Sequence, residues 1–289
     1  MVVESLHAQG PPPVTTSAPP GSDPTLARVV AVGLGAGLLS GSFGVGGGVL
    51  MVPAMVLLLG IDQRRASGTS LAAIVPIAAV GVVGFAIQDQ LDLPAAALLG
   101  IGAITGAPLG ARLIHTIPVP RLRAGFAALL LLTAARLLFA LPESVVDESI
   151  GIVDGASVVA VGFASGLLAG LFGVGGGILM VPAQMVILGI DPATAKGTSL
   201  LVVIPAAASG TVQNLRRANS DLRVAAILGA SGALTAFGGA FLATRMSTGV
   251  ASGLFALLLV ASALRMIDLS RWGATRRRAR SRGQDRPST

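Results

Sequence analysis

One stretch of sequence occurs twice in this chain. Residues 41–53 read GSFGVGGGVLMVP, and residues 170–182 read GLFGVGGGILMVP. When 37–76 is aligned with 166–205 without a gap, 25 of 40 positions are identical. Chance similarity between apolar segments does not keep glycine, proline, aspartate and threonine in register. The chain is therefore predicted to hold two copies of one unit, and we expect any binding site to be built from both.

The composition indicates a membrane protein. Hydrophobic residues make up 53% of the chain and charged residues 11%, whereas a soluble domain carries about 25% charged residues. Water could not solvate such a surface, so the solvent is predicted to be a bilayer. Ten apolar segments without strand-like alternation predict an all-α polytopic fold: 27–43, 49–60, 70–87, 94–114, 124–141, 156–172, 178–190, 199–215, 222–243 and 249–267.

The segments on either side of each GVGGG are short. A full crossing needs about 20 residues, and these four segments fall below that length. Residues 49–60 would cover about 18 Å at 1.5 Å per residue. We therefore predict a helix broken at each GVGGG, at a depth where only protein or a wet cavity can satisfy the backbone.

Loop charges predict the orientation. The loop at Arg64 and Arg65 is basic, whereas the linker at 142–155 carries only acidic charges. Basic loops face the cytoplasm, so both termini are predicted inside and the linker outside. Five segments per repeat is an odd number, which predicts inverted repeats. A re-entrant pair at each GVGGG preserves this parity, whereas a single broken crossing would give parallel repeats.

This pattern divides the chain into five parts. They are a disordered tail at 1–26, a first transmembrane repeat at 27–141, the acidic extracytoplasmic linker at 142–155, a second repeat at 156–268 and a basic cytoplasmic tail at 269–289.

Several functional classes are disfavoured. The chain has no cysteine and only two histidines, His7 and His115, so it offers neither a thiolate site nor a histidine metal cluster. No cofactor is expected. The basic tail is predicted to contact anionic membrane lipid and not nucleic acid. No nucleophile, paired carboxylate or nucleotide-binding motif is present, which argues against an enzyme and against a primary pump.

The glycine turns are the first candidates for a binding site. Glycine allows positive φ and close approach of backbone N–H groups, and a broken helix presents amides carrying about half a positive charge. These features predict an anion site that needs no cationic side chain. The alternative is close helix packing. The candidate residues are Gly46, Gly47, Gly48, Gly175, Gly176 and Gly177.

Other polar residues follow each turn. Asp62 and Asp191 are predicted helix caps, with proton or cation coupling as the alternative. Hydroxyl groups open the third and eighth segments, where they could contact substrate, cap the helix or bond to their own helix. Polar amides in apolar segments are expected to face the interior, bonded to another helix or to a ligand. These hydroxyl and amide residues are Thr69, Ser70, Thr198, Ser199, Gln184 and Asn214.

Arginine and tryptophan mark the predicted interfaces. Arg136 and Arg265 correspond across the repeats and are expected to extend to the membrane surface. Trp272 is expected to anchor the inner interface.

With these motifs the sequence resembles the sulfite exporter TauE/SafE family of bacterial membrane proteins. The resemblance rests on GxFGVGGG, the following LMVP, GTSL in both halves, and LGARL at 109–113, and it covers about 27–268. The second half departs from LGARL, because Phe241 stands where the first half has Arg112. A role for Arg112 is therefore expected to be one-sided and structural. The resemblance implies movement of sulfite, sulfonates or related small anions across the plasma membrane.

These observations together predict a secondary transporter for a small anion. It would export the anion by alternating access at a midplane site between the repeats, with a proton or cation as a possible coupling ion. An anion channel could use the same helix ends and is the first alternative. A membrane-embedded enzyme and a sensor or assembly subunit are the others. The sequence leaves the oligomeric state open.

Overall fold

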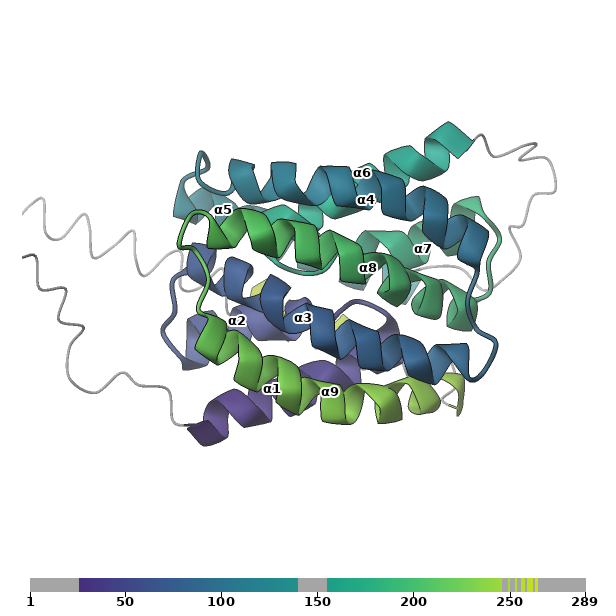
Figure 1. The fold of residues 1–289 in the computed structure, drawn as a ribbon, viewed down its shortest axis with the longest axis horizontal. Helices are drawn as coiled ribbons and strands as arrows, with labels where there is room; N and C mark the ends of the chain where they lie inside the picture. The colour runs from purple at the N-terminus through teal and green to yellow at the C-terminus, as the bar shows by residue number, and fades with distance from the viewer. Residues whose placement is uncertain are drawn as a thin grey trace, which may run out of the picture.

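The computed structural model describes residues 26–139, 155–245 and part of 249–264. Every element in this described part is an α-helix (Figure 1). The helices are α1 (Leu26–Phe43), α2 (Gly48–Leu58), α3 (Gln63–Ala86), α4 (Leu93–Leu113), α5 (Val119–Phe139), α6 (Gly155–Phe172), α7 (Gly177–Ile187), α8 (Pro192–Leu215) and α9 (Leu222–Arg245). The predicted linker, apart from Gly155, and both tails, apart from Leu26, lie outside the described residues. So do Arg265, Trp272 and the side chain of Arg136.

The helix bounds recur at the offset that separates the two copies in the sequence. Helices α6, α7 and α8 begin and end at the positions that correspond to the bounds of α1, α2 and α3, and the start of α9 corresponds to that of α4. The two runs of sequence therefore fold locally in the same way, because the same caps and glycines fall at the same places.

Two of the predicted segment starts are wrong. Helices α3 and α8 begin at Gln63 and Pro192, well before the predicted starts at 70 and 199. The physical reason is the cap, because the carboxylates of Asp62 and Asp191 accept hydrogen bonds from the first backbone N–H groups. The hydroxyl residues at 69–70 and 198–199 therefore lie within these helices and do not open them.

Six helices are long and apolar enough to cross a membrane: α1, α3, α4, α6, α8 and α9. The expectation that the segments before each GVGGG are too short is wrong, because α1 and α6 each reach 18 residues. Only the segments after the break, α2 and α7, are short, at 11 residues each. The protein is thus a multi-pass membrane protein.

The outward faces of these helices are apolar. Leu234 on α9 is 80% exposed and Leu132 on α5 is 70% exposed, while large side chains such as Phe85 and Phe126 are fully buried. Contact between such leucines and lipid tails carries no free-energy cost, whereas exposing them to water would.

Helix α1 packs along α9 through glycine. A Cβ atom placed on Gly33 would lie 2.7 Å from the carbonyl oxygen of Leu228, and one on Gly41 would lie 2.1 Å from that of Ala236. The contacts advance in the same direction on both helices, so α1 and α9 run parallel with their backbones touching. Helices α4 and α6 pack in the same way, because Gly102 meets Val159 and Gly110 meets Leu167. The first helix of each half therefore packs against the fourth helix of the other half.

Helices α3 and α8 cross at the centre in opposite directions. Gly81 lies against the side chain of Leu200, and Gly210 lies against that of Leu71. As the residue number rises on one helix it falls on the other, so these two corresponding helices are antiparallel. Figure 1 shows both along the front of the bundle.

Each GVGGG is a reversal of the chain. Gly47 lies against the backbone of Ala36, and Leu50 lies against Gly35, so α2 folds back along α1. Gly176 meets the backbone of Ser165 in the same way, and α7 folds back along α6. The segment pairs are therefore re-entrant hairpins in this structure and not single broken crossings.

Candidate functional site

The two GVGGG turns adopt the same conformation. Three glycines in each turn have positive φ, with values of 70°, 79° and 75° in the first turn and 72°, 88° and 83° in the second. Residues with a side chain rarely adopt this conformation, so the sequence needs glycine here. In chain order these residues are Gly44, Gly46, Gly47, Gly173, Gly175 and Gly176. Gly48 and Gly177 follow as the first residues of α2 and α7.

The turns touch each other at the middle of the bundle. A Cβ atom on Gly48 would lie 2.3 Å from the carbonyl oxygen of Gly173, and one on Gly177 would lie 2.4 Å from that of Gly44. All the residues of 44–49 and 173–178 are buried. The structure thus brings together the six glycines that were predicted as a site.

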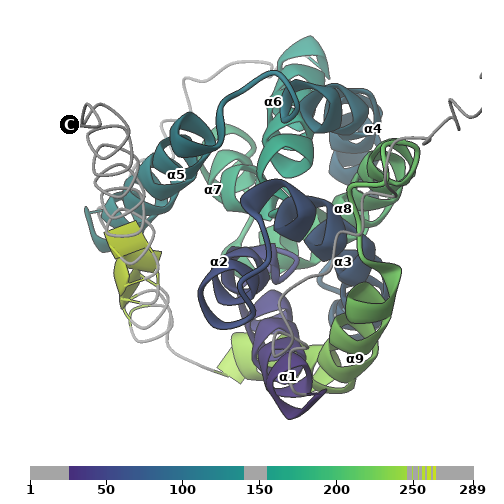
Figure 2. The same cartoon turned by 90° about the vertical axis from the view of Figure 1, so that its left-hand side faces the viewer.

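The depth of this contact follows from its neighbours on α3 and α8. Side chains of Ile74 and Val203 lie 3.2 Å from the Cβ position of Gly46. Each is the twelfth of the 24 residues in its helix. The turns therefore meet halfway along the two central helices, and the N-termini of α2 and α7 approach this level from opposite ends of the bundle. Figure 1 shows α2 to the left of centre and α7 to the right, and Figure 2 shows both to the left of α3 and α8.

Serine side chains of one half hold the turn of the other half. The hydroxyl of Ser199 on α8 donates a hydrogen bond of 2.9 Å to the carbonyl oxygen of Gly44. The hydroxyl of Ser70 on α3 donates to the carbonyl oxygen of Gly173 and also to that of Ser67. Both serines are fully buried. The sequence left open whether these hydroxyls cap a helix or bond to their own helix. Both serines instead bond to the turn of the other half, and Ser70 also bonds to its own helix.

The backbone N–H groups of the turns have no such partner. Among the described residues, none of the five amides of 45–49 and none of the five of 174–178 donates a hydrogen bond. The first intrahelical bonds are donated by Leu50 and Met51, both to Gly47. A buried N–H group without an acceptor costs about 1–3 kcal/mol. Ten such groups at two helix N-termini form a region of positive potential in a low-dielectric setting.

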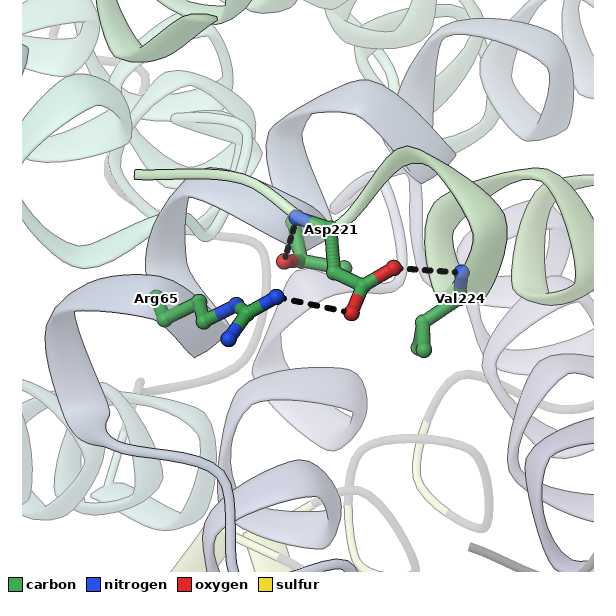
Figure 3. Close-up of polar contacts among 4 residues, drawn as sticks. Arg65, Asp221 and Val224 are labelled. Atoms are coloured by element: carbon green, nitrogen blue, oxygen red, sulfur yellow. Dashed lines mark hydrogen bonds and ion pairs between the residues drawn. The ribbon is translucent and has the colours of Figure 1, made fainter. Parts of the chain in front are cut away.

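Thr69 and Thr198 lie one residue before these serines, and their hydroxyls bond to the residues that precede α9 and α4. Their hydroxyl oxygens accept hydrogen bonds of 2.9 Å and 2.8 Å from the backbone N–H groups of Asp221 and Asp92. Asp221 also accepts from the N–H of Val224 and pairs with Arg65 at 3.0 Å (Figure 3). The side chain of Arg65 is 58% exposed, so this ion pair contributes at most about 1 kcal/mol. The threonines thus fasten each central helix to a loop of the other half, away from the turns.

Sequence reasoning missed four participants in these contacts. Gly44 and Gly173 supply the carbonyl oxygens that the serines hold, and Asp92 and Asp221 supply the N–H groups that the threonines accept. The two members of each pair occupy corresponding positions of the two halves and are identical. This identity between the halves is the sequence signal from which these four residues could have been predicted.

The two buried amides lie apart from the turns. Gln184 on α7 donates to the carbonyl oxygens of Met180 and Ala195, and its own side-chain oxygen has no partner. Asn214 near the end of α8 donates to the carbonyl oxygen of Gly210 and accepts from the side chain of Asn219. Both residues face the interior as expected. Both side chains form hydrogen bonds to other residues of the protein, which is the pairing alternative.

Asp62 and Asp191 are exposed helix caps at opposite ends of the bundle. Partial burial raises the pKa of Asp191, but hydrogen bonds from Thr194 and Ala193 outweigh it, and the net pKa lies below the usual value. The prediction that both aspartates cap helices is confirmed.

The two ends of the bundle differ in charge. One end holds the start of α3, the end of α4, the end of α8 and the start of α9, and its loop includes His115. Partial burial lowers the pKa of His115, and the guanidinium groups of Arg217 and Arg64 lower it further. The described charges at this end are Arg28, Asp62, Arg64, Arg65, Arg112, Arg121, Arg123, Arg216, Arg217, Asp221 and Arg223, and those at the other end are Asp89, Asp92, Asp191, Lys196 and Arg245.

Lys196 breaks the symmetry between the turns. It lies on α8 and packs its backbone against Gly44, whereas the corresponding residue in the first half, Ser67, packs against Gly173. Lys196 is half-buried and makes no ion pair with a described residue. One turn therefore has a cationic side chain beside it and the other has a hydroxyl.

Comparison with known proteins now adds to this geometry. The sequence profile described as "Sulfite exporter TauE/SafE" matches residues 3–137 and 158–288, which is most of the chain. The chain belongs to the TauE/SafE family. No solved structure matches this family member.

Curated relatives of this TauE/SafE protein carry transporter names. The chain is 27% identical to "Probable membrane transporter protein YunE" of Bacillus subtilis over 210 residues, which is 65% of this chain and 77% of the relative. It is also 27% identical to a "Probable membrane transporter protein" of Xylella fastidiosa (strain Temecula1) over 250 residues, which is 83% of this chain and 94% of the relative. The family and these relatives identify a membrane transporter.

The serine contacts of this TauE/SafE protein give a first testable expectation. Ser199→Ala leaves the buried carbonyl oxygen of Gly44 without its donor and is expected to cost about 1–3 kcal/mol of stability. The matched control is Ser209→Ala on the same helix, because its hydroxyl bonds only to Ala206 of α8 itself. Thermal unfolding of both variants in detergent measures the difference. Equal melting temperatures would show that the contact between the halves adds nothing.

Proposed function

We propose that this protein is a secondary transporter that moves a small anion, of the sulfite or sulfonate class, across the plasma membrane. The observation that carries the proposal is the pair of buried helix N-termini with ten unpartnered amides, halfway along the central helices. Such amides bind anions without a cationic side chain. The family description supplies the sulfur oxyanion as the substrate class.

The arrangement of the hairpins supports transport by alternating access. The two turns touch, so an anion can bind to their amides only when the turns separate. Movement of the α1–α2 hairpin would expose the site toward one end, and movement of the α6–α7 hairpin would expose it toward the other. Helices that touch through glycine, such as α1 and α9, can slide along each other because no side chain at the contact has to move. This transport requires no catalytic group.

Export is the proposed direction. The basic end is assigned to the cytoplasm by the positive-inside rule, and its arginines raise the local concentration of anions there. At the opposite end Lys196 is the cation beside the first turn. Both termini then lie in the cytoplasm of a bacterium, with the membrane being the inner one.

Orientation can be tested separately, because the chain has no native cysteine. Thr116 and Asp89 are exposed at the basic and acidic ends. A cysteine at Asp89 should react with an impermeant thiol reagent added to intact cells, and a cysteine at Thr116 should react only after lysis. The reverse pattern would contradict the assigned orientation.

The transport proposal is tested with purified protein in vesicles. Sulfite and methanesulfonate fluxes should saturate with concentration and should respond to an imposed pH gradient if a proton is the coupling ion. Gluconamide, a neutral solute, serves as the control and should not move. Flux of neutral solutes or cations without any anion flux would overturn the proposal. Anion flux that does not saturate would favour the channel alternative.

A further inference from the structure

Two buried serines beside the turns have free hydroxyl groups. Ser40 on α1 and Ser165 on α6 are both 0% exposed, and neither hydroxyl has a hydrogen-bond partner. In an apolar setting such a group costs free energy unless something binds to it. The other described helical serines all have an interaction: Ser42, Ser67, Ser70, Ser157, Ser199, Ser209 and Ser231.

The backbone of each serine contacts its turn directly. The carbonyl oxygen of Ser40 accepts a hydrogen bond of 2.8 Å from the N–H of Gly44. The carbonyl oxygen of Ser165 lies 2.8 Å from the Cβ position of Gly176, the residue that precedes α7. Each free hydroxyl therefore belongs to a residue whose own backbone touches a turn.

The repeat shows in which direction these side chains point. In the alignment of the two halves, Ser40 corresponds to Ala169 and Ser165 corresponds to Ala36. The methyl groups of Ala36 and Ala169 each lie 3.4 Å from the Cβ position of the turn glycine, Gly47 and Gly176 respectively. Because corresponding positions have the same surroundings, the serine at each of these positions also faces its turn.

Each turn thus has one hydroxyl and one methyl group at these two positions, with the order exchanged between the halves. The first turn has alanine and then serine one helical turn later, and the second has serine and then alanine. The donors are therefore not related by the symmetry of the repeats. They would contact different oxygen atoms of a ligand held between the turns.

We propose that Ser40 and Ser165 donate hydrogen bonds to two oxygen atoms of the bound anion and so select an oxyanion over a halide. This inference rests on the proposed function and names the determinant of specificity at that site. The turn amides attract any small anion. If a single-atom halide contacts only one of the two hydroxyls, the other stays buried and unpaired, which a site built for hydrogen bonding does not tolerate. A sulfite or sulfonate group carries three oxygen atoms and can satisfy both.

The test measures binding of sulfite, methanesulfonate and chloride to the purified full-length protein in detergent. Ser40→Ala and Ser165→Ala should each weaken the binding of the oxyanions about tenfold, while chloride binding stays within about twofold. The melting temperature without ligand should be unchanged or higher in both variants, because a methyl group replaces an unpaired hydroxyl. A serine with a purely structural role would lower the melting temperature and leave the affinity unchanged.

The matched control is Ser231→Ala on α9. Ser231 is buried, but its hydroxyl donates to Ile227 of its own helix, so this variant should bind all three anions as the wild type does. Wild-type oxyanion affinity in both Ser40→Ala and Ser165→Ala would overturn the inference and leave the proposed function standing. A wild-type protein that binds none of the three anions would overturn both.

Discussion

Gly37→Val is expected to prevent the chain from reaching its folded state. Gly37 lies in the middle of α1, and a Cβ atom there would lie 1.8 Å from the carbonyl oxygen of Gly232 on α9. The obstacle is backbone, so no side chain can move aside and the two helices must separate along their length. Overpacking of a core costs about 1–3 kcal/mol when side chains can adjust, and we expect roughly 3 kcal/mol or more here.

The measurement is the amount of monodisperse protein after detergent extraction, followed by its melting temperature. Gly238→Ala on α9 is the control, because nothing lies within 4 Å of its Cβ position. It removes a glycine from a helix interior and should raise the stability by up to about 1 kcal/mol. A Gly37→Val protein that melts with the wild type would contradict the parallel packing of α1 on α9.

The second large effect is expected at the turns. Gly176 has φ of 83°, and its Cβ position lies 2.8 Å from the carbonyl oxygen of Ser165. Gly176→Ala therefore combines backbone strain of about 1–3 kcal/mol with a steric conflict of similar size. We expect a loss of about 3 kcal/mol in stability, together with a loss of transport. Chemical unfolding in detergent and vesicle flux measure the two effects.

Gly189→Ala separates the two contributions. Gly189 has φ of 63° and lies at the end of the same hairpin, but nothing lies within 4 Å of its Cβ position. This variant should show the strain alone and keep its transport activity. If both variants lose the same stability, the contact with Ser165 is unimportant and the turn requires glycine only for its conformation.

The sequence pattern of the glycine turns did not distinguish a functional helix break from close packing. The two GVGGG runs predicted either a functional break or close packing. In the structure Gly44 and Gly173 help to reverse the chain through positive φ, and their missing side chains admit the backbones of Lys196 and Ser67 from the other half. Local geometry and tertiary contact impose the same residue, so composition alone could not distinguish them.

The helical hydroxyls show a different limit. Thr69 and Ser70 were candidates because hydroxyls at the start of the third predicted segment could contact substrate, cap the helix or bond to their own helix. Their partners, Asp221 and Gly173, lie in the other half of the sequence. Nothing near Thr69 in the chain indicates which half supplies the partner, since the pairing depends on how α3 and α8 cross.

The sequence by itself determined the all-helical membrane class, the repeated pattern, the caps at Asp62 and Asp191, and the helix breaks at the glycines. These features depend on residues that are close together in the chain or on the average character of the surface, so they can be recognised locally. Only the tertiary structure decided that each first helix packs on the fourth helix of the other half and that the two turns meet midway along α3 and α8. It also decided that Ser40 and Ser165 remain unbonded beside those turns. The physical reason is that backbone contacts between glycines and hydrogen bonds across the halves depend on the direction and depth of each helix, which a sequence spacing does not encode.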